Sequence, residues 1–162
     1  AGLPACHISQ KLSGSEEAFT ADLLAALRAA TANLIVLAGY MKQLPAPVIA
    51  AYRHRILNIH PALLPSFGGK GMYGLRVHQA VLAAREPLTG ATVHIVDEEY
   101  DHGPIVLQRT VPVLATDSAE SLAARVLEME HAVLPEALRL FAEGRVSVVE
   151  GHSHVHIVSL QE

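Results

Sequence analysis

The chain has 162 residues, 51% of them hydrophobic, and a formal charge of −4 at pH 7. It can therefore bury the core of one domain, and it offers no basic stripe for a nucleic acid. Cys6 is the only cysteine, and no apolar run of about 18 residues is present, so we expect no disulfide, no cysteine-based zinc site, no membrane span or signal peptide, and a reduced, cytoplasmic setting.

The first part of the chain alternates between strand and helix patterns. A short strand is expected over residues 5–9, and a helix begins at Ser15, whose hydroxyl suits a helix N-terminus. The apolar run 33–39 is typical of a strand buried on both faces, a short helix is expected over 45–52, and 55–58 is the next strand. This alternation predicts an α/β fold with a mostly parallel sheet flanked by helices.

The second part begins with a glycine-rich segment, Gly68–Gly74. Its glycines predict a mobile loop or lid. Its order of residues does not match a phosphate-binding P-loop. The elements expected beyond it are a helix over 77–85, a strand over 91–96, an acidic turn over 97–104, a strand over 105–113, and a long helix over 117–142 with a kink at Pro135. Residues 151–162 should close a single domain as a strand or an extended tail.

Asn58 and His60 are the strongest candidates for chemistry. They are two residues apart on a strand, so their side chains point to the same side, and Pro61 ends the strand directly after them. An imidazole, a carboxamide donor and the carboxylates of the acidic turn would make an acyl-transfer set. No hydroxyl or thiol nucleophile accompanies them, which favours direct attack by a substrate amine or water. The alternative is a histidine and an asparagine that satisfy the backbone of a loop.

Two further groups of polar residues are weaker candidates. His152, His154 and His156 would share one face of a strand and could bind a metal, although a solvated edge strand explains them as well. Glu130 and His131 could contact a ligand or could belong to the polar face of the long helix. The pattern favours the second explanation in both cases.

At residues 58–61 the sequence resembles phosphoribosylglycinamide formyltransferase, the glycinamide ribonucleotide transformylase of purine synthesis. Further motifs follow in the family's order and cover most of residues 1–150, so that the set is specific although each motif alone is weak. The motifs are Leu37-Ala38-Gly39-Tyr40-Met41, Arg55-Ile56-Leu57-Asn58-Ile59-His60-Pro61-Ala62-Leu63-Leu64-Pro65, Gly90-Ala91-Thr92-Val93-His94, Asp101-His102-Gly103-Pro104-Ile105 and Glu130-His131-Ala132-Val133-Leu134-Pro135. The resemblance implies a Rossmann-like formyltransferase fold.

The resemblance also implies roles for individual residues. The family's catalytic residues correspond to Asn58, His60 and Asp101. Its enzymes transfer the formyl group of 10-formyltetrahydrofolate to the amine of glycinamide ribonucleotide without a metal. Glu130 matches a contact to glycinamide ribonucleotide. The residues implied in folate binding are Tyr40, Met41, Lys42, Gln43, Leu44, Asn58, Asp97, Glu98, Glu99, Tyr100 and Asp101. The partners implied are these small substrates, with the protein as a monomer or homodimer.

The chain departs from the family pattern in three ways. Family members begin with a strand and a Gly-Ser-rich turn that holds the substrate phosphate, and we expect this first strand and phosphate loop to be missing here. Glu16 and Lys42 stand where arginine is common.

The alternative functions are a formyltetrahydrofolate deformylase, which uses water as the acceptor, and an inactive folate-binding fragment. His60 followed by Pro61 favours the transferase over the deformylase, and the acidic chain does not suit a methionyl-tRNA formyltransferase.

Overall fold

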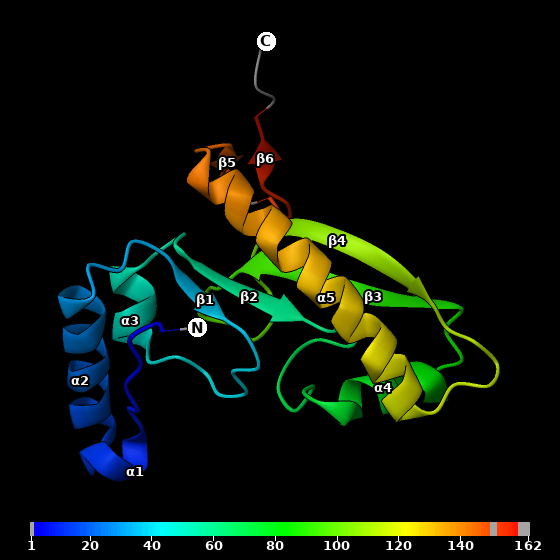
Figure 1. Ribbon diagram of the computed structural model, residues 1–162, viewed down its shortest axis with the longest axis horizontal. Coiled ribbons are helices and arrows are strands. Elements are labelled where there is room, and N and C mark those ends of the chain that lie inside the picture. Colours follow the sequence, from blue (N-terminus) through cyan, green and yellow to red (C-terminus); the bar gives the residue numbers. More distant parts are fainter. Residues whose placement is uncertain (1, 150–151, 159–162) are drawn as a thin grey trace.

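The computed structural model describes residues 2–149 and 152–158 of the chain (Figure 1). Its helices and strands follow one another in the order α1 (Gln10–Ser13), α2 (Glu16–Ala29), β1 (Ile35–Leu37), α3 (Ala46–Ala51), β2 (Ile56–His60), α4 (Leu75–Ala83), β3 (Leu88–Ile95), β4 (Ile105–Pro112), α5 (Ala119–Ala142), β5 (Val146–Ser147) and β6 (His156–Ile157). The expected α/β class is confirmed.

The four main strands form one sheet in the order β1-β2-β3-β4. β1 and β2 are parallel, whereas β3 is antiparallel to both β2 and β4. The sheet of the described residues is therefore mixed, and the expectation of a mostly parallel sheet is wrong for its second half.

The physical reason lies in the connection between β2 and β3. His60, the last residue of β2, pairs with Thr92, while Leu57 pairs with Ile95. β3 therefore starts at the end of the sheet where β2 stops, and α4 stays at that end, packed against α5 (Figure 1). A helix between two strands usually returns the chain to the other end of the sheet, and nothing in the sequence pattern marks this exception.

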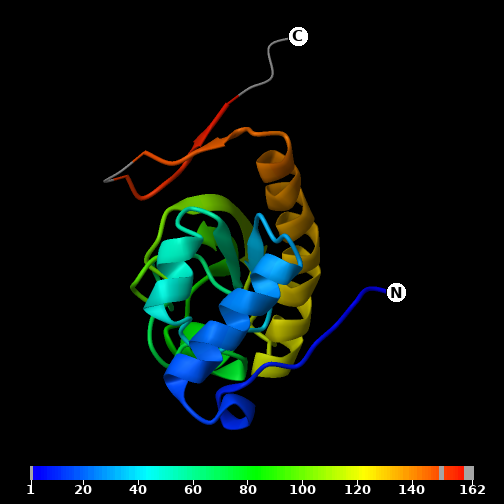
Figure 2. The same cartoon turned by 90° about the vertical axis from the view of Figure 1, so that its left-hand side faces the viewer.

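Helices cover both faces of the sheet, and the two faces have separate cores (Figures 1 and 2). On one face α5 contributes Val133 and Ala137, which are fully buried against Leu57 of β2. On the other face Ile56 packs against the buried residues of α3 and the leucines of α2. Neighbouring residues of β2 thus enter opposite cores, as the alternation of side chains along a strand requires. Asn58 and His60 share the face of Ile56.

The two ends of the described chain differ from the expectations. Residues 5–9 form no strand. Near the other end β5 and β6 pair as a short antiparallel hairpin, and His154 makes a bridge to Ile105 at the start of β4. The part of the expected tail at residues 151 and 159–162 lies outside the described residues. α5 continues through Pro135. Among the described helices, none is both long and apolar enough to span a membrane.

Candidate functional site

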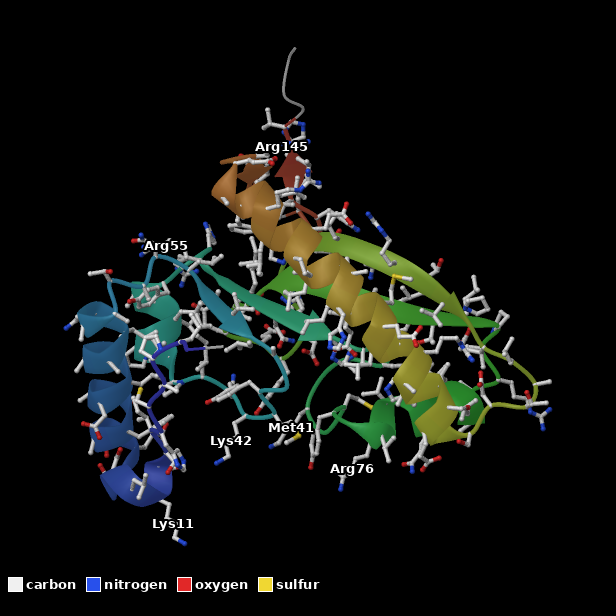
Figure 3. All side chains as sticks on the ribbon, viewed as in Figure 1. Lys11, Met41, Lys42, Arg55, Arg76 and Arg145 are labelled. Atoms are coloured by element: carbon white, nitrogen blue, oxygen red, sulfur yellow. The ribbon has the colours of Figure 1, made fainter. Side chains whose placement is uncertain are left out.

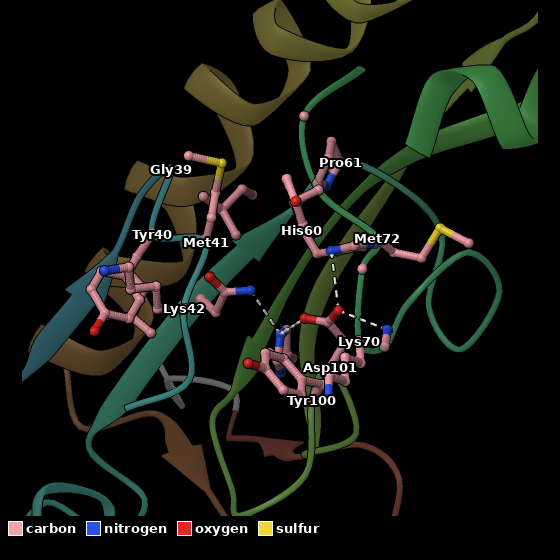
Figure 4. A pocket seen from close by; sticks show the side chains of 18 of the residues that line it. Gly39, Tyr40, Met41, Lys42, His60, Pro61, Lys70, Met72, Tyr100 and Asp101 are labelled. Atoms are coloured by element: carbon pink, nitrogen blue, oxygen red, sulfur yellow. Dashed lines mark hydrogen bonds and ion pairs between the residues drawn. The ribbon is translucent and has the colours of Figure 1, made fainter. Parts of the chain in front are cut away.

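A cavity of about 820 Å³ opens where β2 leaves the sheet. Asn58 and His60 line it from β2, and Asp101 lines it from the turn between β3 and β4. The remaining walls come from the segment after β1, from the glycine-rich loop, from α4 and from the first half of α5. The sequence-predicted residues Asn58, His60 and Asp101 therefore meet in one cavity. Figure 4 shows His60 and Asp101 facing each other there.

Asn58 is held by a histidine on the neighbouring strand. Its side-chain amide donates to Nε2 of His94 over 3.1 Å, and His94 is the cross-strand partner of Asn58 in the β2–β3 register. Nδ1 of His94 lies 3.1 Å from the carbonyl oxygen of Ile95, which can only accept, so Nδ1 carries the proton and Nε2 is the acceptor. This bond uses one of the two N–H groups of Asn58 and leaves the second for a ligand.

His60 is 3% exposed and lies between two acceptors. Its Nε2 donates to the carbonyl oxygen of Phe67 over 2.8 Å, and its Nδ1 lies 3.6 Å from Oδ2 of Asp101. Burial lowers the pKa of His60 below its ordinary value, although the charge of Asp101 and the bond to Phe67 act in the opposite direction. The imidazole therefore titrates in a balance between desolvation and a neighbouring carboxylate.

Asp101 joins the catalytic candidates to the glycine-rich loop. The Gly69 N–H donates to Oδ2 of Asp101 over 2.9 Å, and Oδ1 lies 3.6 Å from Nε2 of His94. Burial alone would raise the pKa of Asp101, but the charge of His60 and the hydrogen bond from the Gly69 N–H lower it below its ordinary value. The residue has a φ of +54°, which is uncommon outside glycine and often marks a functional position. The carboxylate is therefore ionised and held in place.

The residues expected to bind folate lie mostly at this cavity. Tyr40, Met41 and Lys42 line one side of it, while Lys70 and Met72 line another (Figure 4). The other expected residues found in the lining are Gln43, Leu44, Asp97, Glu99 and Tyr100. Met41, Lys42 and Arg76 project along the same edge of the molecule (Figure 3).

Glu98 is the exception among these expected residues. It lines a second cavity of about 590 Å³, which shares residues 39–44 with the first. The side-chain carboxylate of Glu98 pairs with Arg53. The backbone carbonyl oxygen of Glu98 accepts a hydrogen bond from Nε2 of Gln43 over 2.8 Å. The acidic turn and the segment after β1 are thus fastened together at Glu98.

Glu130 reaches the first cavity from α5, as expected for a ligand contact. Burial raises the pKa of its carboxyl group, and the nearby His131 opposes the rise. His131 itself is exposed and is not among the residues that line the cavity. Of the two residues, only Glu130 is positioned to meet a ligand in this cavity, and its contact with the acceptor stays a prediction.

The glycine-rich loop is attached to the site at its base. Phe67 accepts from His60, and Gly69 donates to Asp101. A Cβ atom at Gly68 would lie 2.5 Å from Cδ2 of Leu64 and 3.1 Å from Cβ of Asp101, so this position has no room for a side chain. Residues 69–76 continue along the cavity wall. The expected lid therefore begins in direct contact with the site.

Sequence reasoning missed two histidines of this cavity, His94 and His78. His94 is 2% exposed and His78 is 4% exposed. His94 lies in the strand expected over 91–96, but only the β2–β3 pairing shows that it meets Asn58. His78 lies on α4, where no local pattern separates it from a packed helix residue. Elsewhere, no three His, Cys, Asp or Glu side chains of the described residues form a group suited to a metal ion, so the three C-terminal histidines gain no support as ligands.

Comparisons with known proteins agree with this geometry. The sequence profile of the family described as formyl transferase matches residues 1–138. The chloroplastic phosphoribosylglycinamide formyltransferase of Vigna unguiculata is 50% identical over 125 residues, which are 77% of this chain and 40% of that protein. The chain thus spans about two fifths of the length of the first curated relatives it matches.

Solved structures give the same result. Glycinamide ribonucleotide transformylase 1 from Symbiobacterium toebii has a TM-score of 0.88 and 44% identity, and the match covers 98% of this chain and 71% of that one. A formyltetrahydrofolate deformylase from Pseudomonas syringae pv. tomato has a TM-score of 0.84 and 32% identity, with 97% of this chain and 50% of that one covered. From its profile match, its relatives and its fold, the chain belongs to the formyl transferase family.

Proposed function

We propose that this cavity transfers the formyl group of 10-formyltetrahydrofolate to the amine of glycinamide ribonucleotide, in purine biosynthesis. The observation that supports this most directly is the convergence of Asn58, His60 and Asp101 in one cavity. The relatives from Vigna unguiculata and Symbiobacterium toebii are named for this acceptor. Folate would be the co-substrate, and the proposed chemistry calls for no metal.

The proposed reaction begins when the acceptor amine attacks the formyl carbon. A new C–N bond forms, the carbonyl π electrons move to oxygen, and the second N–H of Asn58 donates to the oxyanion. The amine nitrogen then loses a proton and N10 of the folate gains one as the C–N10 bond breaks. His60 carries this proton through Nδ1, because its Nε2 is bonded to Phe67. Asp101 holds the imidazole and stabilises its protonated form.

The binding of the two substrates follows from the walls of the cavity. We place the folate against Tyr40–Leu44 and the acidic turn 97–101, where Tyr40 and Met41 offer apolar surface and Gln43 is fixed by Glu98. We place the acceptor near Glu130 on α5. The formyl carbon would then lie between these walls, beside Asn58 and His60.

Hydrolysis of the formyl donor is the second candidate, because the deformylase from Pseudomonas syringae shares the fold. The test is to incubate the purified protein with 10-formyltetrahydrofolate, with and without glycinamide ribonucleotide, and to measure formylated acceptor and tetrahydrofolate separately. Formylated acceptor in stoichiometric yield is the expected result. Equal release of tetrahydrofolate without acceptor would indicate a deformylase, and folate binding without either product would indicate a binding fragment.

We further propose that the protein is one domain, acts in the cytoplasm and is a monomer or homodimer. The single cysteine, Cys6, is exposed and suits a reducing compartment. The relative from Vigna unguiculata is called chloroplastic, so cell fractionation with an antibody is the appropriate test. Light scattering of the purified protein would give the number of subunits.

A further inference from the structure

Three side-chain atoms of the described residues are buried without a hydrogen-bond partner in the protein: Nδ1 of His78, Oγ1 of Thr89 and Nε of Arg125. Such atoms are rare in folded proteins, because each costs about 1–3 kcal/mol of lost solvation. An unpartnered atom therefore calls for an explanation, and a ligand is one when the residue lines a cavity.

His78 is the one of these three residues that lines the large cavity. Thr89 lies in β3 and lines neither of the two cavities described above. Arg125 is bound through another nitrogen, since its guanidinium donates to the carbonyl oxygen of Pro112 over 3.1 Å and pairs with Asp117. A bound molecule in the large cavity could reach only the imidazole of His78 among these groups.

The position of His78 indicates which substrate it would meet. It lines the cavity from α4, which packs against α5, and α5 contributes Leu127 and Glu130 to the same lining. The expected folate residues come instead from residues 40–44 and 97–101, on other segments of the chain. Burial lowers the pKa of His78 and the charge of His60 lowers it further, so the ring is neutral at pH 7 and near the reacting centre.

We propose that His78 binds the acceptor substrate, with Nδ1 making a hydrogen bond to a polar group of its glycinamide portion. This inference rests on the function proposed above and adds a residue to the acceptor side of the site. A neutral imidazole suits this role, because glycinamide offers both N–H and C=O groups and Nδ1 can donate or accept according to its tautomer.

Three substitutions at position 78 separate hydrogen bonding from packing. His78→Asn keeps a polar atom near the place of Nδ1, His78→Gln keeps one near the place of Nε2, and His78→Leu keeps only the bulk. We expect the Kd for glycinamide ribonucleotide, measured by calorimetry, to rise about tenfold for the Leu and Gln variants, the size of one lost hydrogen bond, and to change much less for the Asn variant. The Kd for 10-formyltetrahydrofolate should not change.

Thermal unfolding and a matched variant complete the test. His78→Leu removes an unpartnered buried polar atom, so the unliganded protein should melt at the wild-type temperature or above it. Thr89→Val removes another such atom outside both cavities and should leave both Kd values unchanged. If the wild type binds the acceptor and His78→Leu binds it equally well, or if the Asn variant is no better than the Leu variant, the inference is wrong while the proposed function stands. If the wild type binds folate but no acceptor, both are wrong.

Discussion

Two hydrogen-bond acceptors lie beside the imidazole of His60: a backbone carbonyl oxygen and the ionised carboxylate of Asp101. One is the Phe67 carbonyl oxygen at 2.8 Å from Nε2, and the other is the Asp101 carboxylate at 3.6 Å from Nδ1. Both favour the protonated ring, whereas burial favours the neutral ring and prevails. The pKa of His60 is therefore set by opposed influences, and a change in either one would alter its readiness to take up and release a proton.

Replacing His60 tests its proposed role directly. We expect His60→Ala to lower the rate of formyl transfer by roughly 10²- to 10⁴-fold, the range typical of a lost general acid or base. The circular dichroism spectrum should show that the fold persists. His7→Ala, at an exposed histidine outside the lining of the large cavity, is the control and should keep the wild-type rate. An unchanged rate in His60→Ala would remove this residue from the mechanism.

Asp101 should control the protonation of His60. Asp101→Asn keeps an oxygen that can accept from the Gly69 N–H but removes the negative charge that raises the pKa of His60. The NMR titration of the His60 ring should therefore move to lower pH. Asp97→Asn is the matched variant, because Asp97 bonds His102 over 2.9 Å and raises the pKa of that residue instead. It should move the titration of His102 and not that of His60; a His60 titration unaffected by Asp101→Asn would contradict the coupling.

Residue-level prediction from the sequence succeeded where neighbours along one strand decide the geometry. The spacing of Asn58 and His60 was enough to place both side chains on one side of β2. The bond from Asn58 to His94 could not be predicted in this way, because it depends on the register between β2 and β3. The position of Glu98 at the second cavity likewise could not be predicted, because it depends on pairing with Arg53, two residues after α3.

At the scale of elements, the direction of a strand was harder to predict than its existence. β3 was expected at nearly its observed position, since an apolar run of this length suits a buried strand. Its direction depends on whether α4 crosses the sheet or remains at one end of it. Here the segment between Pro61 and Gly74 occupies the end of the sheet and keeps α4 there. The same arrangement brings the base of the glycine-rich loop onto the site, where Phe67 contacts His60 and Gly69 contacts Asp101.

At the base of the glycine-rich loop, position 68 requires glycine because its neighbours leave too little space for a side chain. In Gly68→Ala the new methyl group would meet Leu64 and Asp101, so one of them must move. Because misplacement of a catalytic group by about 1 Å can cost up to 10²-fold in rate, we expect kcat to fall about 10- to 100-fold. Gly144→Ala is the control: its φ of +66° makes alanine strained, but nothing lies within 4 Å. It should lower the melting temperature and leave kcat unchanged, and a wild-type kcat in Gly68→Ala would mean that Asp101 tolerates displacement.

At the scale of the whole molecule, the buried histidines link stability to pH. Burial lowers the pKa of both His60 and His78 in the folded protein, below the value of 6.5 that an exposed histidine has. Both rings are neutral in either state above this pH, and their contribution to stability is then complete. As the pH falls below 6.5, the unfolded chain binds protons that the folded chain cannot bind, so the free energy of unfolding falls until the folded pKa is reached.

Asp101 and His102 also make the free energy of unfolding depend on pH. Asp101 does so in a more acidic range, and His102 acts in the opposite direction to the buried histidines. The pKa of Asp101 is lowered from 3.8, so its stabilising contribution is present above that pH and is lost only in stronger acid. The pKa of His102 is raised, so its contribution is present below pH 6.5 and is lost as the pH rises through the folded pKa. Because His102 is exposed, solvent screens its interaction with Asp97 and the effect is small. The buried histidines should therefore dominate just below pH 6.5.

Urea unfolding between pH 7.5 and 5.5 should detect this linkage. We expect the free energy of unfolding to decrease on acidification with a slope of up to about 1.4 kcal/mol per pH unit for each proton taken up only by the unfolded chain. His78→Leu removes one of the two buried imidazoles and should flatten the slope, whereas His7→Leu removes an exposed one and should leave it as it is. Equal slopes in the wild type and in His78→Leu would mean that His78 becomes protonated as readily in the folded protein as in the unfolded chain. In that case the ring would be a cation beside His60 below pH 6.5, and its proposed role as a neutral partner of the acceptor would be confined to higher pH.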